Sequence, residues 1–273
     1  MVDLSKLLNK DTFIISDTHF GHKNVLLFEP LRLEYLIDYD DSVLDEGNLL
    51  LDLIKQYQYE ELKSIKEVDE LLELLSPKHD EMLIEKWNSV IGANDTVLHL
   101  GDFAFRNING YTSKLNGNKI LLRGNHDYKS DGTYFKAGWK DVISQVRLIV
   151  DNSTYIKYPS DNIYMNAIVK LIEFGEDYLT ILFSHYPLFD NNEWNMKKFG
   201  YITDALEEVF SDFQCDANIH GHTHSSNASD SRCLNVSLET CPWLMPLKIE
   251  DLIKNKKVFE QGITEQIDDE TPF

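Results

Sequence analysis

The sequence predicts an α/β fold in which short buried strands are combined with helices. Short apolar runs, typical of buried strands, recur along the chain. Amphipathic helical patterns fill the interval between the first two runs, and alternating polar and apolar residues in the second half indicate antiparallel strands and hairpins. With 273 residues, the chain has the length of one large domain or of one domain with an insertion.

The predicted strands are short, and the first four are rich in aliphatic or aromatic residues. They span residues 12–16, 97–100, 120–123, 179–184, 217–220 and 232–236. Alternating stretches at 145–150 and 154–158, followed by a turn near Gly175, predict antiparallel pairs. We therefore expect the sheet formed by the second half to be antiparallel or mixed.

Helices are expected mainly between the first two strands. Residues 60–75 predict an amphipathic helix, with four apolar residues on one stripe: Leu62, Ile65, Leu72 and Leu75. Ser76 then resembles an N-cap and Pro77 a first helical residue, which predicts a second helix that runs through Trp87 and ends before residue 92.

The charge is unevenly distributed along the chain. Residues 29–90 hold 17 acidic and 6 basic residues, and so carry −11 of the net charge of −20. We interpret this segment as an acidic helical insertion, or cap, within a domain that spans residues 1–254. The polar and acidic residues 255–273 are predicted to form a C-terminal tail.

Composition restricts the expected partners. The 26 basic residues against 46 acidic ones produce a field that repels a polyanion, so long nucleic acid is disfavoured as a partner, although a local basic patch remains possible. Three cysteines, Cys215, Cys233 and Cys241, do not form a disulfide framework and indicate reduced thiols. No run approaches membrane-spanning length, so we expect a soluble cytoplasmic protein with no membrane partner; the oligomeric state stays open.

Polar residues follow five of the predicted strands where each strand ends. Ligands of open α/β sheets bind outside the carboxyl ends of the strands, and imidazole with carboxylate suits Mn, Fe or Zn. The pattern predicts a two-metal hydrolytic centre, built from Asp17, His19, Asp102, Asn125, His126, His185, His222 and His224.

Each group has an expected role. Asp17 and His19 leave an extended strand two residues apart and can bind one ion, which His224 would also reach. Asp102 has two carboxylate oxygens and is assigned as the bridge between the ions. The second ion is expected to be bound by Asn125, His185 and His222.

Other residues are expected to act on the substrate. His126 lies next to a ligand and is the candidate general acid or transition-state stabiliser. Asp127 either orients it or caps the turn. His22 is expected to contact a substrate phosphate, and Arg123 to contact a phosphate or to pair with a carboxylate. Three further histidines are interpreted as packing residues: His79, His99 and His220. For Tyr186, packing and lining the pocket are equally favoured.

These residues resemble the calcineurin-like metallophosphoesterases, whose pattern is Asp-x-His, Gly-Asp, Gly-Asn-His-Asp/Glu, His and Gly-His-x-His. All elements occur here in that order, and residues 16–24, 87–88 and 99–105 resemble a small bacterial and phage-type subgroup. The resemblance implies a four-layer sandwich of two facing mixed β-sheets flanked by helices. It also implies hydrolysis of phosphomonoesters or phosphodiesters with two divalent metal ions, of which Mn²⁺ is favoured and Fe, Zn or Ni is possible.

The leading hypothesis is therefore metal-dependent hydrolysis of a small, nucleotide-like phosphoester by a metal-activated water. The alternative is a nuclease acting on single strands, which would need a basic groove. A non-catalytic scaffold is disfavoured by the intact ligand set, and a metallo-β-lactamase-like site by the absence of His-x-His-x-Asp-His. We expect the acidic insertion to pack on the rim of the site and to restrict access by long polyanions.

Overall fold

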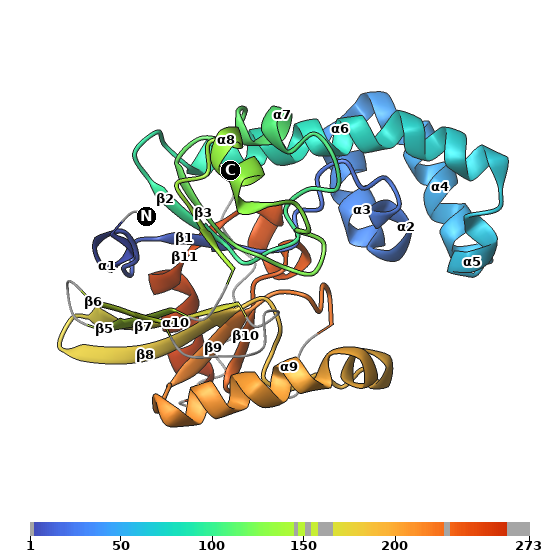
Figure 1. Ribbon diagram of the computed structural model, residues 1–273. Helices are drawn as coiled ribbons and strands as arrows, with labels where there is room; N and C mark the ends of the chain where they lie inside the picture. Colours follow the sequence, from blue (N-terminus) through green and yellow to red (C-terminus); the bar gives the residue numbers. More distant parts are fainter. Residues whose placement is uncertain (1–2, 145–146, 151–153, 158–165, 227–229, 261–273) are drawn as a thin grey trace.

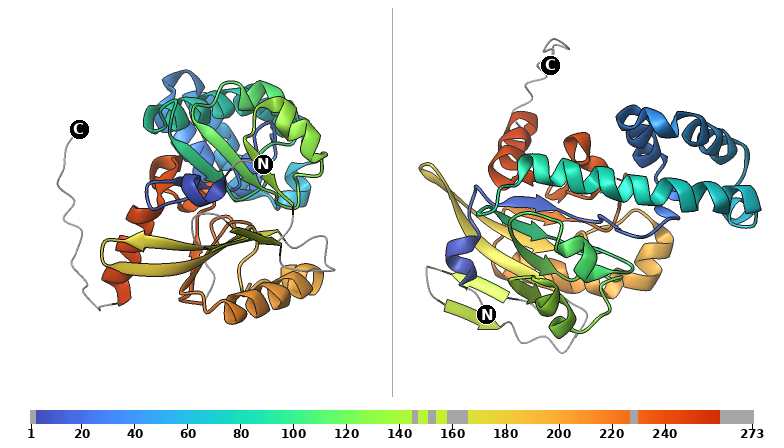
Figure 2. Two further views of the ribbon diagram at one scale, coloured as in Figure 1. Left: turned by 60° about the vertical axis from the view of Figure 1, so that its left-hand side comes forward. Right: turned by 90° about the horizontal axis from the view of Figure 1, so that it is seen from above.

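The computed structural model describes residues 3–144, 147–150, 154–157, 166–226 and 230–260. Two mixed β-sheets face each other, and helices cover their outer sides (Figures 1 and 2). The predicted fold class is confirmed.

The first sheet has the strand order β11-β1-β2-β3-β4. Four strands are parallel: β1 (Phe13–Ile15), β2 (Thr96–His99), β3 (Asn118–Leu122) and β4 (Asp141–Ile143). The short β11 (Leu247–Lys248) pairs antiparallel with β1. Because the four parallel strands end at the same edge, the loops after β1, β2 and β3 lie together there.

The second sheet has the order β10-β9-β8-β7-β5-β6. Its strands are β5 (Arg147–Val150), β6 (Thr154–Lys157), β7 (Ala167–Phe174), β8 (Asp177–Ser184), β9 (Ala217–His220) and β10 (Cys233–Asn235). The antiparallel pairs β5–β6 and β7–β8 confirm the prediction for the second half. Residues 145, 146 and 158 of the predicted strands lie outside the described residues. Strands β8, β9 and β10 are parallel, so the loops after β8 and β9 share one edge.

Helix α9 (Glu193–Asp212) covers the outer face of the second sheet (Figure 1). No helix was predicted here from the sequence. Its buried Ile202, Leu206 and Val209 share a cluster with Val169 and Leu182 of the sheet. The remaining helices outside residues 24–91 are α1 (Leu4–Leu7), α7 (Ile108–Thr112), α8 (Asp131–Ala137) and α10 (Ile249–Glu260), with 3-10 turns at Leu238–Thr240 and Pro242–Leu244.

The acidic segment is helical, as predicted. It comprises α2 (Val25–Phe28), α3 (Pro30–Tyr39), a 3-10 turn (Asp41–Val43), α4 (Leu44–Gln56), α5 (Tyr59–Leu62) and α6 (Lys66–Val90). Helices α3 and α4 pack against each other and against α6, and Figure 2 shows them as a lobe beside the sheets.

Two predicted helix boundaries in this segment are wrong. The predicted break at Ser76 and Pro77 does not exist, because α6 continues through Pro77. Buried residues keep a spacing of three or four across this point, at Leu72, Leu75 and His79, so packing outweighs the hydrogen bond that proline removes. The predicted helix 60–75 is instead divided between α5 and α6.

The four apolar residues of the predicted stripe pack into the main hydrophobic core and not only against the edge of the sheets. Leu62, Leu72 and Leu75 are buried, and Ile65 packs against the same cluster. Leu33 and Leu36 of α3 and Leu50 of α4 are buried in the same cluster and complete this part of the core. The insertion therefore has a packed interior that is continuous with the main core.

The predicted tail begins later than expected. Helix α10 extends to Glu260, so residues 255–260 continue a helix, and residues 261–273 lie outside the described residues. Among the described residues, no helix combines the length and the apolar character needed to cross a membrane.

Candidate metal centre

The predicted site residues gather where the strand ends of the two sheets meet. The backbone N–H of Ser16 donates to Val236 O and so joins loops of the two sheets. Within the second sheet, the backbone N–H of Gly221 donates to His185 O. The backbone N–H of His222 also donates to the Asp17 carboxylate at 2.9 Å. These bonds fix the loops after β1, β8 and β9 relative to one another.

A first group consists of Asp17, His19 and His224. Asp17 Oδ1 lies 3.7 Å from His19 Nε2 and 3.9 Å from His224 Nε2. Asp17 Oδ1 and His19 Nε2 are buried and have no hydrogen-bond partner among the described residues. Because an unpaired buried polar atom is costly, this convergence of lone pairs fits a cation.

A second group consists of Asp17, Asp102 and His185. Asp102 Oδ2 lies 3.6 Å from His185 Nε2 and 3.7 Å from His19 Nε2. It therefore faces one imidazole from each predicted ion shell. His185 Nδ1 donates to Leu100 O at 2.8 Å, a contact that leaves its Nε2 lone pair directed to the site.

Asn125 joins the second group through its amide oxygen. Asn125 Oδ1 lies 2.9 Å from His185 Nε2 and 3.1 Å from His222 Nδ1. His222 Nε2 is buried without a partner among the described residues. The three residues predicted for the second ion are thus brought together.

The backbone at this site is strained. Nine non-glycine residues of the described part have positive φ, and five are predicted ligands: Asp17, His19, Asp102, His222 and His224. Such conformations persist where the surroundings enforce them, and they concentrate at functional sites. Close approach also requires glycine at two positions. A Cβ at Gly124 would lie 2.3 Å from Asp102 Oδ1, and one at Gly221 would lie 2.4 Å from Asp17 Oδ2.

The electrostatics also fit a cation. Burial lowers the pKa of His19 to about 3 and also lowers the pKa of His185, so both imidazoles remain neutral and can donate lone pairs. Burial and the neighbouring Asp17 raise the pKa of Asp102 well above its usual range. Two carboxylates and the neutral imidazoles of His19, His185 and His222 form a donor set that divalent cations satisfy. Although burial opposes protonation, Glu239 and Asp17 raise the pKa of His224 to about 9.

His126 lies beside the ligand groups and reaches solvent. Its Nε2 is 4.0 Å from Asp102 Oδ2, and 43 % of its side chain is exposed. Its ring centroid is 4.7 Å from that of Phe105. Burial also lowers its pKa. The structure therefore places His126 at the mouth of the site, where the sequence predicted a catalytic group.

His22 and Arg123 differ in how many of their hydrogen-bonding groups already have partners in the protein. His22 stacks on Phe105 with ring centroids 3.8 Å apart, and its Nδ1 lies 3.4 Å from His19 Nδ1. Arg123 donates to the backbone oxygens of Asp127 and Lys129 and pairs with Asp131 at 3.1 Å. Of the two alternatives for Arg123, the structure therefore contains the carboxylate pair.

Asp127 is a turn cap. Its carboxylate accepts from the backbone N–H groups of Asp102 at 2.7 Å, Gly124 at 3.0 Å and Phe103 at 3.3 Å. It thus fixes two site loops rather than the His126 ring. His99 is structural, as predicted, with Nε2 2.9 Å from Thr18 Oγ1.

A buried pair that was not predicted from the sequence, Arg32 and Glu239, holds the site. The Arg32 guanidinium, fully buried, donates to Asp17 O at 2.6 Å, to Thr18 O at 3.0 Å and to Glu239 Oε1. Glu239 Oε1 lies 3.2 Å from His224 Nδ1, so it orients that imidazole. Although burial opposes ionisation, Arg32 and His224 lower the pKa of Glu239 to about 2. The only sequence signal was an arginine in the apolar face of a helix.

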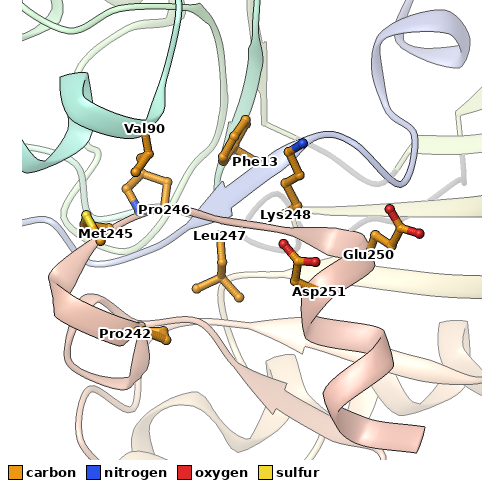
Figure 3. A pocket seen from close by; sticks show the side chains of 9 residues that line it. All are labelled: Phe13, Val90, Pro242, Met245, Pro246, Leu247, Lys248, Glu250 and Asp251. Carbon is orange, nitrogen blue, oxygen red and sulfur yellow. The ribbon is translucent and has the colours of Figure 1, made fainter. Parts of the chain in front are cut away.

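Two cavities differ in their relation to this cluster. One, of about 580 Å³, opens beside Asn125 and His126 and extends to α9. The other, of about 360 Å³, lies near the start of β1, around the junction of β11 and α10 (Figure 3). Phe13 and Lys248 line it, and none of the predicted site residues does, so it lies apart from the candidate metal centre.

The chain is similar to known proteins over most of its length. The family model of the calcineurin-like phosphoesterases matches residues 12–226. The chain is similar to the gene 66 protein of Mycobacterium phage D29, with 22% identity over 210 residues that cover 68% of this chain and 87% of the phage protein. It is also similar to the gene 66 protein of Mycobacterium phage L5, with 26% identity over 170 residues that cover 54% of this chain and 65% of that protein.

A similar solved structure is that of a protein of unknown function from Aquifex aeolicus. It has a TM-score of 0.53 and 21% sequence identity, and the match covers 89% of this chain and 98% of that one. At this identity, the likeness concerns the fold alone.

Proposed function

The chain belongs to the calcineurin-like phosphoesterase family, and on that premise we propose that it hydrolyses a small phosphoester at a dinuclear metal site. The observation that carries the dinuclear proposal is the position of Asp102. One oxygen of this carboxylate lies within 3.7 Å of His19 Nε2 and within 3.6 Å of His185 Nε2. A carboxylate between two groups of ligands suits a bridge between two ions.

The proposed ligands of the first ion are Asp17, His19 and His224, and those of the second are Asn125, His185 and His222, with Asp102 shared. The unpaired buried atoms of Asp17 and His19 support the first set. The second set is supported by the Asn125 amide oxygen, which lies 2.9 Å from His185 Nε2 and 3.1 Å from His222 Nδ1. The donors are oxygen and imidazole nitrogen without thiolate, which favours Mn²⁺ and also accommodates Fe, Zn or Ni. Bound ions of this kind lower the pKa of a water towards neutrality and stabilise the charge of the phosphoryl group.

Two side chains are proposed to act on the leaving oxygen and on the substrate phosphate. We assign to His126 the donation of a hydrogen bond or a proton to the leaving oxygen, because it is next to Asp102 and reaches solvent. Neutral imidazole keeps one N–H and can donate a hydrogen bond, whereas donation of a proton requires the protonated ring. His22, stacked on Phe105 beside His19, is the proposed contact to a phosphate oxygen of the substrate.

The test is a matrix of metals and substrates with the purified protein. We expect chelation to abolish activity and Mn²⁺ to restore it best. A bis(p-nitrophenyl) diester, a p-nitrophenyl monoester, cyclic nucleotides and oligonucleotides would define the substrate class. Hydrolysis that persists in excess chelator after prolonged incubation would contradict the metal proposal. Single-stranded oligonucleotides as the best substrates would favour the nuclease alternative.

A further inference from the structure

The cavity beside His126 lies between the loop after β3 and the first turns of α9. Its volume of about 580 Å³ falls within the range of pockets that hold small molecules, roughly 300–1,000 Å³. Six lining residues matter for what it can bind: Tyr128, Asn166, Tyr186, Lys198, Phe199 and Tyr201.

Aromatic side chains surround this pocket. The ring of Phe199 lies 5.1 Å from that of Tyr186 and 5.3 Å from that of His222, so the aromatic wall continues to a proposed metal ligand. Tyr128 and Tyr201 are 63% and 51% exposed. Exposed aromatic faces beside a cavity can stack on a planar ring, as in proteins that bind nucleic-acid bases.

The same pocket has a cation and a hydrogen-bond acceptor. Lys198 Nζ lies 4.6 Å and 4.9 Å from the ring centroids of Trp194 and Phe199. Asn166 Nδ2 donates to Arg123 O, while its buried Oδ1 has no hydrogen-bond partner among the described residues. A cation suits a phosphate, and an amide oxygen suits a ring N–H or an amino group.

The position of His126 indicates which part of the substrate enters the pocket. His126 lines the cavity, and under the proposed function it donates to the leaving oxygen. The group attached to that oxygen must therefore extend into the cavity. We propose that this group is a nucleotide, whose base stacks on Tyr128, Phe199 and Tyr201 and whose own phosphate contacts Lys198. This inference rests on the proposed function and names the leaving-group side of its substrate.

The test measures binding to the full chain after removal of metal. Three probes separate the contacts: adenosine 5′-monophosphate, ribose 5-phosphate and adenosine, with the other nucleoside monophosphates as alternative bases. We expect adenosine 5′-monophosphate to bind about ten-fold or more tightly than ribose 5-phosphate, as base stacking typically provides. Tyr201→Ala should reduce that ratio, and its exposed ring makes loss of folding an improbable explanation.

Matched variants separate charge from stacking. Lys198→Ala should weaken adenosine 5′-monophosphate and ribose 5-phosphate equally, and adenosine little. Lys197→Ala removes the same charge from an exposed neighbour that does not line the pocket, and should change nothing. Tyr178→Ala is the corresponding aromatic control on β8. Equal binding of all nucleoside monophosphates and ribose 5-phosphate, unaltered by Tyr201→Ala, would overturn the inference.

Hydrolysis of bis(p-nitrophenyl) phosphate with Mn²⁺ tests the proposed function, and the binding measurements test the nucleotide pocket. If this diester is hydrolysed but binding shows no preference for a base, the nucleotide pocket is refuted and the proposed function stands. Base-dependent binding that Tyr201→Ala abolishes, without hydrolysis under any metal, would support the pocket and refute the proposed function.

Discussion

Asp102 has an oxygen between imidazoles of both proposed ion shells, so its substitution tests the bridge directly. Asp102 Oδ1 accepts a hydrogen bond from His126 N at 2.8 Å, and Asp102→Asn keeps both the side-chain shape and an oxygen that can accept this bond. We expect metal affinity to fall by at least about ten-fold and activity to be largely lost, because an amide that keeps its oxygen on His126 N places an NH₂ group, which cannot bind a cation, at the position of Oδ2. Metal content and turnover measure this. A variant with two tightly bound ions and native rates would refute the bridge.

The same variant has a second, opposite effect in the metal-free chain. The raised pKa of Asp102 means that the metal-free fold binds a proton more strongly than the unfolded chain does, so its stability falls as pH rises above the ordinary value of 3.8. Asp102→Asn removes this loss. Above that pH the metal-free variant should unfold at a higher temperature than the metal-free parent, whereas with Mn²⁺ the order should reverse.

His126 is the residue whose role can be separated from metal binding. It belongs to neither three-residue group, and 43 % of its side chain is exposed. His126→Gln should retain both metals and lower turnover by roughly 10² to 10⁴, the range for a lost general acid. The loss should be smaller for substrates with good leaving groups. If metal occupancy collapses instead, His126 is a ligand or supports one.

At the residue scale, sequence motifs predicted which side chains meet but not what holds them. Asp17 and Asp102 are brought together because the parallel strands β1 and β2 end at one edge, and that rule can be applied to a sequence. His185 follows β8 of the other sheet, and its approach to them depends on how the two sheets face each other. Arg32 and Glu239 are 207 residues apart and meet only because α3 packs across the site. No local pattern encodes such a long-range pair.

At the scale of elements, strands were predicted better than helix ends. Apolar runs located five strands to within two residues: β1, β2, β3, β8 and β9. A strand whose two faces are both buried needs apolar side chains at successive positions, so it is visible in the sequence. Helix α9 was not predicted, because two aromatic residues of this helix, Trp194 and Tyr201, are exposed and interrupt the separation of apolar and polar faces. The break at Pro77 was wrong because tertiary packing overrode a local signal.

That error yields a prediction for α6. Pro77 is exposed within the helix and cannot donate the backbone hydrogen bond of that turn. Pro77→Ala should stabilise the fold by about 1–3 kcal/mol, which for a chain of this size is a rise of about 2–4 °C per kcal/mol in thermal unfolding. Activity should not change. Leu74→Ala, at a half-exposed position of the same helix, is the control and should shift stability by less than about 0.5 kcal/mol. Destabilisation by Pro77→Ala would show that the fold requires proline there.

At the scale of the whole molecule, the acidic insertion is built into the site. Arg32 of α3 donates to Asp17 O, and Asp80 of α6 accepts from Gly21 N at 3.1 Å and from Tyr111 Oη at 2.6 Å. Removing residues 33–63 would also expose the apolar face of α6 that packs on α3 and α4. The helical character of this segment was predictable from its charge and periodicity, whereas its support of the site depends on tertiary contacts.

The predicted restriction of access is therefore best tested through charge. Tyr59 of α5 contacts Phe28 with ring centroids 6.3 Å apart, and the Phe28 ring lies 5.5 Å from that of His224. Helix α5 thus packs beside the site through Tyr59, and its next two residues, Glu60 and Glu61, are exposed. Glu60 also pairs with Lys63 at 2.8 Å. The negative charge of Glu60 and Glu61 should repel a long polyanion more than a small diester, because a polyanion has charges that extend beyond the site.

Glu60→Gln combined with Glu61→Gln should raise kcat/KM for oligonucleotides about two- to five-fold relative to bis(p-nitrophenyl) phosphate at low salt. The difference should disappear near 1 M salt, where the screening length falls to about 3 Å. Glu173→Gln with Glu176→Gln makes the same change of charge at the turn of the β7–β8 hairpin, the far end of β8 from His185, and should leave the ratio unchanged. An equal rise in this control would mean that the net charge of the whole chain, rather than the insertion, limits access. If neither pair alters the ratio, the insertion supports the metal-binding loops and does not select substrates.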